Sequence, residues 1–586
     1  MMKKTVSACI ALSLSVMAPV SVAQLSQPIK QTLSEQYAGK VYSPYAGRDF
    51  PEQPLWGDTH LHTSLSFDAG AFGNRLNPEA AYRFARGEEV ISSTGQPVRL
   101  ARPLDWLAIT DHSDGMGFTD DALAASPLVT SYEQGARWSK GFKAGGQEAV
   151  DATLDMIQTF SQGKMDPEMF ANYSPGSRRF ATLWDEVINN AERFNDPGRF
   201  TAFIAFEWTS LVKGGNMHRN VIFRDGADRA RQVVPYTTSA PMGSTDPLDL
   251  FKYLENYETK TNGTIMALAH NGNLSNGIMF PVDAQYTGKK IDKSYVEQRA
   301  RWERIYEITQ IKGDGETHPL LSPDDEFADY ANWDVGNLDL SEAKTDDMLA
   351  YEYAREALKN GLLLEKKLGT NPYKFGFTGA TDSHTSLSTA EEDNYFAKHA
   401  GYEPSPERLT HPFTKTENGE IFAWQMVASG ITAVWARENT RASIFDAMDR
   451  KEVYGTTGPR IVVRFFGGYD FSEADLRSRE ISATGYAGGV PMGGDLTAAP
   501  EGKAPTFLVG ALRDPIGANL DRIQIVKGWI GADGKTHEKV YDVAWSGNRE
   551  FNADGQLTSV GNTVDVATAT WTNTIGAPEL VSVWRD

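Results

Sequence analysis

Histidine and acidic residues recur at the ends of apolar segments in this chain, and these residue types bind divalent metal ions. The stretch GDTHLHTSLSFDAG places His60 and His62 one residue apart, shortly after Asp58. Residues two apart on a strand point the same way, so both imidazoles can face one ion while Asp58 orients one of them from behind. The stretch GATDSHT repeats this spacing with Asp382 and His384.

Four further segments end or begin an apolar run with a candidate ligand. DWLAITDHSDG supplies Asp111 and His112, which diverge on a regular strand, so we favour His112. FIAFEWTS supplies Glu207, GGNMHRNVIF supplies His218, and IMALAHNGNLSNG supplies His270. A lone histidine after an apolar run is more often a structural residue than a ligand, and Glu207 alone also fits a buried charge paired with an arginine. The repetition at one position, the strand end, is what favours a metal site.

The cysteine content narrows the ligand chemistry. The chain has one cysteine, Cys9, and it lies inside a segment typical of a cleaved secretory signal. The mature protein would then have no thiol ligand, disulfide or cysteine nucleophile. A site built from imidazoles and carboxylates alone suits two or three divalent ions such as Zn, Mn or Fe.

The elements that must position these residues are strands alternating with helices. Short apolar runs recur between residues 55 and 458, and they are DWLAIT, FTAFIAF, TIMALAH, RIYEIT, KFGFTGAT and GITAVWA. Between them lie amphipathic segments such as 178–194, whose apolar residues fall on one helical face. This alternation predicts a parallel sheet covered by helices, and its length favours a barrel with insertions. Side chains at the carboxyl ends of barrel strands converge on one mouth.

The chain divides into four predicted segments. Residues 1–23 are expected to be a signal peptide, 24–54 an N-terminal arm, 55–458 the metal-binding barrel, and 459–586 a β-rich domain resembling an antiparallel sandwich. The signal indicates a periplasmic or secreted protein with no membrane insertion after cleavage. A net charge of −20 argues against nucleic acid as a partner. The sequence does not indicate an oligomeric state.

The motifs GDTHLHT, ITDHSDGMG, FEWTS, HRNVIFR, AHNGNLSNG, IKGDGETHP and TGATDSHT together resemble a bacterial family named domain of unknown function 3604. The resemblance runs from about residue 40 to the C-terminus. The order of ligand motifs is also similar to the polymerase and histidinol phosphatase (PHP) superfamily of metal hydrolases. That similarity implies a distorted (β/α)7 barrel with up to three metal ions and, most often, phosphoester hydrolysis.

The PHP resemblance also implies an allocation of ligands. It would place His60, His62, Glu207 and Asp382 around one ion. Glu207 would bridge to a second ion, and a third would lie near two further histidines. The second ion would be held by His218 and His270, and the third by His112 and His384. The superfamily often has another ligand soon after its H-x-H motif, and Asp68 is the candidate here.

Five residues are candidates for assisting hydrolysis of an anionic small-molecule ester. His318, after the RIYEIT run, is placed either to protonate the leaving group or to cap the following turn. Lys312 and Arg219 either neutralise ester oxygens or are ordinary solvated charges. Asn271 and Asn273 either donate hydrogen bonds to substrate or shape their Gly/Asn-rich turn.

The leading hypothesis is therefore a metal-dependent hydrolase of phosphomonoesters or phosphodiesters. One alternative keeps the metal ions and changes the bond, giving a sulfatase or an amidohydrolase. Another is a non-catalytic protein that binds metal or glycan. The sequence contains no G-x-S-x-G or H-E-x-x-H motif, which disfavours serine hydrolases and zincin proteases.

Overall fold

The computed structural model describes residues 49–586 except 402, 427–428 and 479. The expected signal peptide and residues 24–48 of the expected arm lie outside the described residues. Chain contacts group Phe50–Asp586 into one compact unit. In this described part, every helix is too short or too polar to cross a bilayer.

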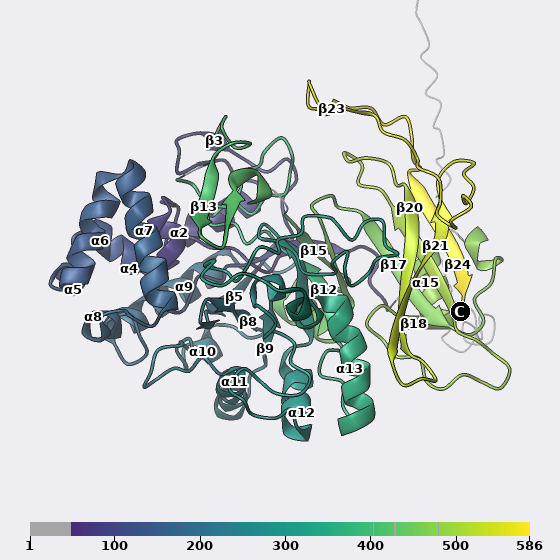
Figure 1. Cartoon of the computed structure of the whole chain (residues 1–586), viewed down its shortest axis with the longest axis horizontal. Helices are drawn as coiled ribbons and strands as arrows, with labels where there is room; N and C mark the ends of the chain where they lie inside the picture. The colour runs from purple at the N-terminus through teal and green to yellow at the C-terminus, as the bar shows by residue number, and fades with distance from the viewer. Residues whose placement is uncertain (1–48, 402, 427–428, 479) are drawn as a thin grey trace, which may run out of the picture. The chain divides into compact units, whose positions relative to one another are not determined.

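A mixed, curled sheet organises the part of this unit between Leu55 and Thr456 (Figure 1). Its strand order within the described residues is β11-β10-β9-β8-β5-β4-β1-β15-β16, and β12 pairs with β10. The strands are β1 Leu55–Asp58, β4 Trp106–Ala108, β5 Thr201–Trp208, β8 Arg219–Phe223, β9 Ile265–Ala269, β10 Ile305–Gln310, β11 Gly313–Asp314, β12 Gly376–Gly379, β15 Ile431–Val434 and β16 Val453–Thr456. The six apolar runs singled out in the sequence all contribute strands to this sheet.

The sheet departs from the all-parallel arrangement that the sequence predicts. Neighbours β1–β4, β4–β5, β9–β10 and β10–β12 are parallel. Strand β8 is antiparallel to both β5 and β9, and β15 is antiparallel to both β1 and β16. The segment 209–218 between β5 and β8 is too short for a parallel crossover, which needs about a dozen residues or more. A regular (β/α)7 pattern is therefore absent from the described strands.

Curling brings β12 back against β15 and β16. The backbone nitrogen of Gly430 donates to the carbonyl of Ala380 at 2.9 Å, and the Thr432 hydroxyl donates to the carbonyl of Gly379 at 2.6 Å. The approach requires glycine, because a Cβ on Gly455 would lie 2.5 Å from the backbone nitrogen of Gly379. Strand ends that are distant in the sheet order are thereby brought around one centre.

Helices cover the outside of the sheet (Figure 1). Helix α9, Arg178–Phe194, packs on β5, while α11, Pro247–Thr261, and α12, Lys293–Trp302, pack on β9. The predicted apolar face of α9 is confirmed as buried, and Ser177 caps the helix by accepting from the backbone nitrogen of Phe180 at 3.0 Å. The remaining large covering helices are α3 Pro78–Ala85, α13 Ala354–Leu368 and α14 Arg441–Asp449.

Two insertions lie between sheet strands. The first follows β4 and contains α4 Phe118–Leu123, α5 Pro127–Thr130, α6 Glu133–Ala144, α7 Gly146–Ser161 and α8 Pro167–Ala171. It buries its own apolar cluster, which includes Phe118, Trp138 and Met156. The second follows β12 and contains the hairpin β13 Pro412–Thr416 and β14 Gly419–Phe422. Both insertions contribute walls to one cavity.

Beyond β16 the strands belong to separate antiparallel sheets, as the sequence predicts. One sheet has the order β18-β17-β19-β24, and β20 and β21 form a hairpin. These strands are β17 Val462–Gly468, β18 Gly489–Pro491, β19 Thr506–Leu512, β20 Arg522–Ile530, β21 Thr536–Trp545 and β24 Glu579–Arg585. A sandwich of two facing sheets stays a prediction.

Candidate metal centre

The H-x-H and D-x-H segments run side by side just beyond β1 and β12. The backbone nitrogen of Asp382 donates to the carbonyl of His60 at 2.9 Å, and that of His62 donates to the carbonyl of Ser383 at 3.0 Å. The Nε2 atoms of His60 and His62 are 3.0 Å apart, and both lie within 3.3 Å of Asp382 Oδ1. The three side chains are buried. Two segments that are distant in the sequence thus form one corner of the centre.

Glu207, near the end of β5, occupies the middle of the centre. Its two carboxylate oxygens lie within 3.5 Å of five imidazoles, those of His60, His62, His112, His218 and His270. Oxygen Oε1 is 2.7 Å from His218 Nδ1 and 2.9 Å from His270 Nε2. Oxygen Oε2 is 3.0 Å from His112 Nδ1. One carboxylate is therefore shared by histidines from several strand ends.

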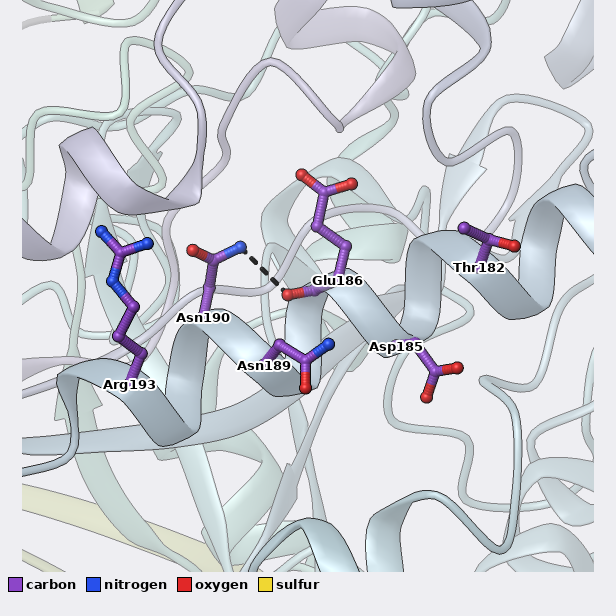
Figure 2. Close-up of a pocket in the computed structure, with 6 residues that line it drawn as sticks. All are labelled: Thr182, Asp185, Glu186, Asn189, Asn190 and Arg193. Carbon is purple, nitrogen blue, oxygen red and sulfur yellow. Dashed lines mark hydrogen bonds between the residues drawn. The ribbon is translucent and has the colours of Figure 1, made fainter.

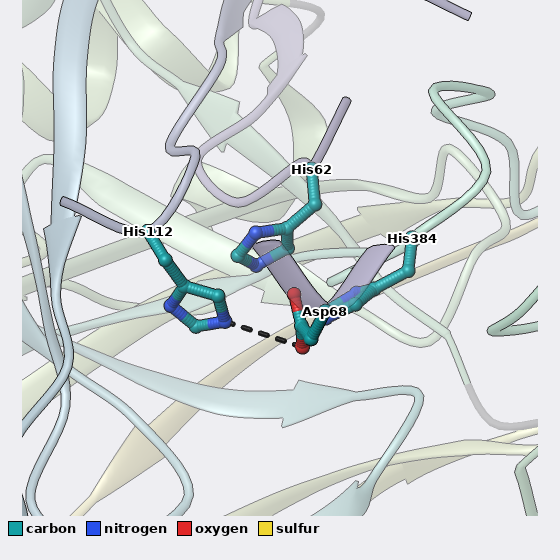
Figure 3. A group of neighbouring side chains, drawn as sticks. All are labelled: His62, Asp68, His112 and His384. Carbon is teal, nitrogen blue, oxygen red and sulfur yellow. Dashed lines mark hydrogen bonds and ion pairs between the residues drawn. The ribbon is translucent and has the colours of Figure 1, made fainter. Parts of the chain in front are cut away.

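Asp68 forms a third corner on the short helix α2, Phe67–Ala71 (Figure 3). Its Oδ2 atom lies 2.8 Å from His384 Nε2 and 3.3 Å from His112 Nε2. The hydroxyl of Ser66 connects this corner to the first, because it contacts Asp68 Oδ1 at 3.2 Å and His62 Nδ1 at 2.8 Å. The structure thus places Asp68 among the histidines that the sequence proposed for a third ion.

Four overlapping groups of side chains have ligand atoms within 4.8 Å of one another. All nine metal-ligand candidates from the sequence lie in these groups. The groups are His62, Asp68, His112 and His384; His60, Glu207 and His270; His60, His62 and Asp382; and His112, Glu207 and His218. The four groups form one compact centre rather than four separate ones, because they share His60, His62, His112 and Glu207.

The donor set fits divalent cations. Two buried imidazole nitrogens in the centre, His218 Nε2 and His270 Nδ1, have no hydrogen-bond partner among the described residues. Leaving such atoms unpaired costs free energy that a coordinated cation would offset. The donor atoms thus suit one ion held by His60, His62, Glu207 and Asp382. The remaining ligand candidates are available to further ions.

The protonation states suit metal binding. Burial lowers the pKa of His218 and of His384 to about 3, so both imidazoles are neutral at pH 7 and keep a lone pair for a metal. Burial opposes ionisation of Glu207, but His112, His218 and His270 hold the pKa of its carboxyl well below the usual range. Burial also opposes protonation of His112, yet Glu207 and Asp68 raise its pKa to about 10. A cation at that position would have to displace this proton.

Two lysines stand beside the carboxylate of Asp382. The Nζ atom of Lys312 lies 2.7 Å from Asp382 Oδ2, and that of Lys398 lies 3.0 Å from the same oxygen. Lys398 is also 3.0 Å from His384 Nδ1, and burial lowers its pKa to about 7. The sequence indicated Lys312 but missed Lys398, which follows an irregular segment with no distinguishing pattern.

The carboxylate behind His60 is Glu307, on β10, and not Asp58. Both oxygens of Glu307 lie 3.3 Å from His60 Nδ1. Asp58 accepts instead from the backbone nitrogen of His60 at 3.0 Å and from the hydroxyls of Thr381 and Ser388 at 2.6 Å. It fixes the backbone of both ligand segments, so its predicted role in orienting a ring is wrong.

Replacing Glu307 with glutamine is expected to weaken metal binding by about 10- to 100-fold, the usual cost of removing the partner behind a ligating histidine. Burial, Asp382 and Asp58 raise the pKa of Glu307, so its ionisation depends on nearby cations and would strengthen their binding in turn. Competition with a chromophoric chelator measures the affinity. The exposed Glu365→Gln on α13 is the control, and equal affinities for both variants would contradict the role of Glu307.

Two residues proposed from the sequence lie outside the centre. His318 Nε2 is 3.1 Å from Asp334 Oδ2, and its Nδ1 accepts from the backbone nitrogen of Leu320 at 3.2 Å, which matches the turn-capping alternative. Arg219, on β8, is fully buried and pairs with Glu303 at 2.9 Å. Among the described residues, neither side chain forms a hydrogen bond or ion pair with a metal-ligand candidate. Each is held by the other partners named above.

The two asparagines after β9 shape their turn. Asn273 donates to the carbonyl of Lys312 at 3.1 Å and, more weakly, to that of Trp333. Asn271, with a φ of 48°, accepts from the side chain of Gln310. Gln310 also donates to Asp382 Oδ2 at 2.7 Å. These contacts fix the loop that carries His270, which is the second of the two interpretations drawn from the sequence.

A cavity of about 310 Å³ opens onto the centre. Its polar end is formed by Asp68, His112, His218, His384, Lys312 and Lys398. Another hollow, of about 370 Å³, lies on the exposed face of α9 (Figure 2). The six side chains that line it, from Thr182 to Arg193, all belong to that one helix, so it lacks an opposing wall. Of these two cavities, the first has room for a ligand beside the metal-ligand candidates.

The fold and centre define a mixed α/β protein with a buried histidine- and carboxylate-rich site able to hold metal ions. The chain belongs to the family described as protein of unknown function DUF3604, whose model matches residues 49–586. No curated protein matches the chain in sequence. Among solved structures, it is similar to a two-domain protein from Bacteroides vulgatus ATCC 8482 containing a predicted PHP-like metal-dependent phosphoesterase, with 10% identity and a TM-score of 0.31 over 84% of this chain and 87% of that one.

Proposed function

We propose that this protein is a metal-dependent hydrolase of small anionic esters, most directly phosphomonoesters or phosphodiesters. The observation that carries the proposal is the Glu207 carboxylate, which is shared by five imidazoles, two of which, His112 and His218, line a cavity. Shared carboxylates hold neighbouring metal ions together. The four overlapping ligand groups support two or three ions, with Zn, Mn or Fe as the candidates that the donor atoms fit.

Metal ions in such a centre lower the pKa of a bound water and stabilise the charge that develops on the ester. The chain itself supplies binding and proton transfer. Lys312 and Lys398 bring ammonium groups to the cavity floor, where they neutralise the non-bridging oxygens of the ester. Lys398, with a pKa of about 7, takes the role of proton donor to the leaving oxygen that the sequence gave to His318.

The alternatives to phosphoester hydrolysis are supported to different degrees by the side chains of the centre. An amidohydrolase commonly uses a carboxylated lysine between its metal ions, whereas here Glu207 has the shared position and both cavity lysines pair with Asp382. A sulfate ester presents a similar tetrahedral anion to the same lysines. A protein that binds metal without turnover would use the same donors, so only measured activity separates it from a hydrolase.

The proposal extends to architecture and location. The return of β12 onto β15 and β16 supports interpreting the curled sheet as a divergent (β/α)7 barrel of the PHP type. Antiparallel sheets after residue 459 support a sandwich-like second domain. We also propose a periplasmic or secreted protein without a nucleic-acid partner, from the N-terminal segment and the charge of −20.

The test combines metal analysis with an ester panel. We expect the purified protein to contain divalent metal and to hydrolyse p-nitrophenyl phosphate or bis-p-nitrophenyl phosphate. Chelation should abolish turnover, and added Mn or Zn should restore it. His60→Ala should remove both metal and activity, while His537→Ala, at a partly exposed histidine on β21, should retain them. Turnover of p-nitrophenyl sulfate alone would establish a sulfatase, and metal binding without any turnover would refute the hydrolase.

A further inference from the structure

The walls of the cavity beside the metal centre differ from its floor. The floor carries four metal-ligand candidates and two lysines, whereas the walls are mostly apolar, with Asp339 and Lys415 as charged exceptions. The walls come from α2 and the residues after it, from α7 in the first insertion, from the segment 333–340, and from the β13–β14 hairpin. A ligand in this cavity would therefore be charged at one end and apolar at the other.

Aromatic rings make up much of the apolar wall. Phe67 and Phe160 pack with ring centroids 5.3 Å apart, and Phe72 and Phe413 pack with centroids 5.8 Å apart. Trp333 contributes an indole that is only 5% exposed. Aromatic rings contact other aromatic rings favourably in stacked and edge-to-face arrangements, beyond the gain from buried area alone. The aromatic part of the wall is thus suited to contact a planar ring.

One buried donor among the wall residues has no partner among the described residues. The indole nitrogen Nε1 of Trp333 is buried and has no acceptor among the described residues. A buried N–H without a partner costs about 1–3 kcal/mol. The wall is thus mostly apolar, with Gln158, Asp339 and Lys415 as polar members of the lining.

The size of the cavity limits the ligand further. Its volume of about 310 Å³ is near the lower end of the range for small-molecule sites. An engineered protein cavity of about 150 Å³ is known to accept benzene. The present cavity thus has room for one aromatic ring together with a tetrahedral anionic head, and little beyond that.

We propose that the preferred substrate is a monoaryl ester of phosphate, with the anion beside Lys312 and Lys398 and the ring against the aromatic wall. This inference rests on the proposed hydrolase function and specifies its substrate class. In the reaction, a water oxygen forms a bond to phosphorus, and the bond between phosphorus and the aryl oxygen breaks. The aryl oxygen takes up a proton, so the products are a phenol and inorganic phosphate.

Binding of non-hydrolysable phosphonates tests the proposal without the different reactivities of leaving groups. Calorimetry with Mn-loaded protein should show phenylphosphonate binding at least about tenfold more tightly than methylphosphonate, the lower bound for lost apolar contact in such a pocket. Phe160→Ala should reduce this ratio. Thr159→Ala, at the preceding residue of α7 but outside the cavity lining, should leave it unchanged. Ile157→Ala on the same wall serves if the first variant fails to fold.

The outcomes separate this inference from the proposed function. Equal binding of the two phosphonates, or a ratio unaffected by both wall variants, would overturn the aryl preference even if phosphoesters are hydrolysed. A preference for phenylphosphonate that depends on Phe160 or Ile157 would support the pocket assignment. If that preference is found in a protein that hydrolyses no ester, the hydrolase proposal fails while the aryl-binding cavity stands.

Discussion

Glu207→Gln is expected to lower metal affinity by more than about 100-fold and to abolish ester hydrolysis. Loss of a partner behind a ligand already costs about 10- to 100-fold, and Glu207 itself lies within 3.5 Å of five imidazoles. An amide has one oxygen and no charge, so it cannot serve two positively charged ions. Metal content per chain, measured on dialysed protein, should fall by at least one ion, and turnover should fall with it.

A matched substitution distinguishes this effect from general damage. Glu186→Gln changes an exposed carboxylate on α9 and should leave metal content and turnover unchanged (Figure 2). Thermal unfolding of both metal-free variants, followed by circular dichroism, checks that Glu207→Gln is folded. A folded Glu207→Gln protein that retains its full metal content and activity would show that the carboxylate is not a shared ligand, and the proposed centre would have to be abandoned.

The sequence could predict the ligand segments because spacing and strand periodicity act locally. Residues two apart share a strand face, so the pairs His60/His62 and Asp382/His384 were recognisable without a structure. Whether the two pairs meet depends on the curl of the sheet, which backbone contacts such as that between Gly430 and Ala380 determine. Residue spacing therefore identified the donor residues. Which donors lie close enough to hold the same ion could be seen only from the folded structure.

Residues that act from behind the ligands were missed for a physical reason. Lys398 comes from an irregular segment, where no periodicity relates a side chain to a direction. Glu307 did carry a signal, because it is an acid inside the apolar run RIYEIT, as Glu207 is inside FIAFEW. A charged residue within a buried strand needs a partner. The same reasoning that selected Glu207 would have selected Glu307.

Sheet topology was the other point at which local patterns failed. The apolar runs that became β5, β9 and β10 are equally compatible with parallel and antiparallel neighbours. Strand β8 begins at Arg219, directly after His218, at the apolar run that the sequence indicated, but its direction in the sheet was not predicted. The short connection from β5 was visible, and its length alone excludes a parallel crossover.

Glu303→Gln is expected to lower the free energy of unfolding by about 3–5 kcal/mol. Glu303 joins two buried guanidinium groups, with its carboxylate oxygens 2.9 Å from Arg219 Nε and 2.7 Å from Arg299 Nε. The exposed fractions of all three side chains are 2% or less. A neutral amide would leave two desolvated cations without a counter-charge. The midpoints of urea and thermal unfolding should both fall in the variant.

The pH dependence of this loss identifies its electrostatic origin. Burial opposes ionisation of Glu303, but Arg219 and Arg299 hold the pKa of its carboxyl below the usual value. Its contribution to stability is therefore present above about pH 4.5 and is lost as the pH falls and the wild-type carboxyl takes up a proton. The difference in stability between wild type and Glu303→Gln should narrow in acid. Glu255→Gln, in an exposed pair with Arg301, should change stability by less than about 1 kcal/mol at any pH. A difference for Glu303→Gln that stays constant with pH would instead indicate loss of packing.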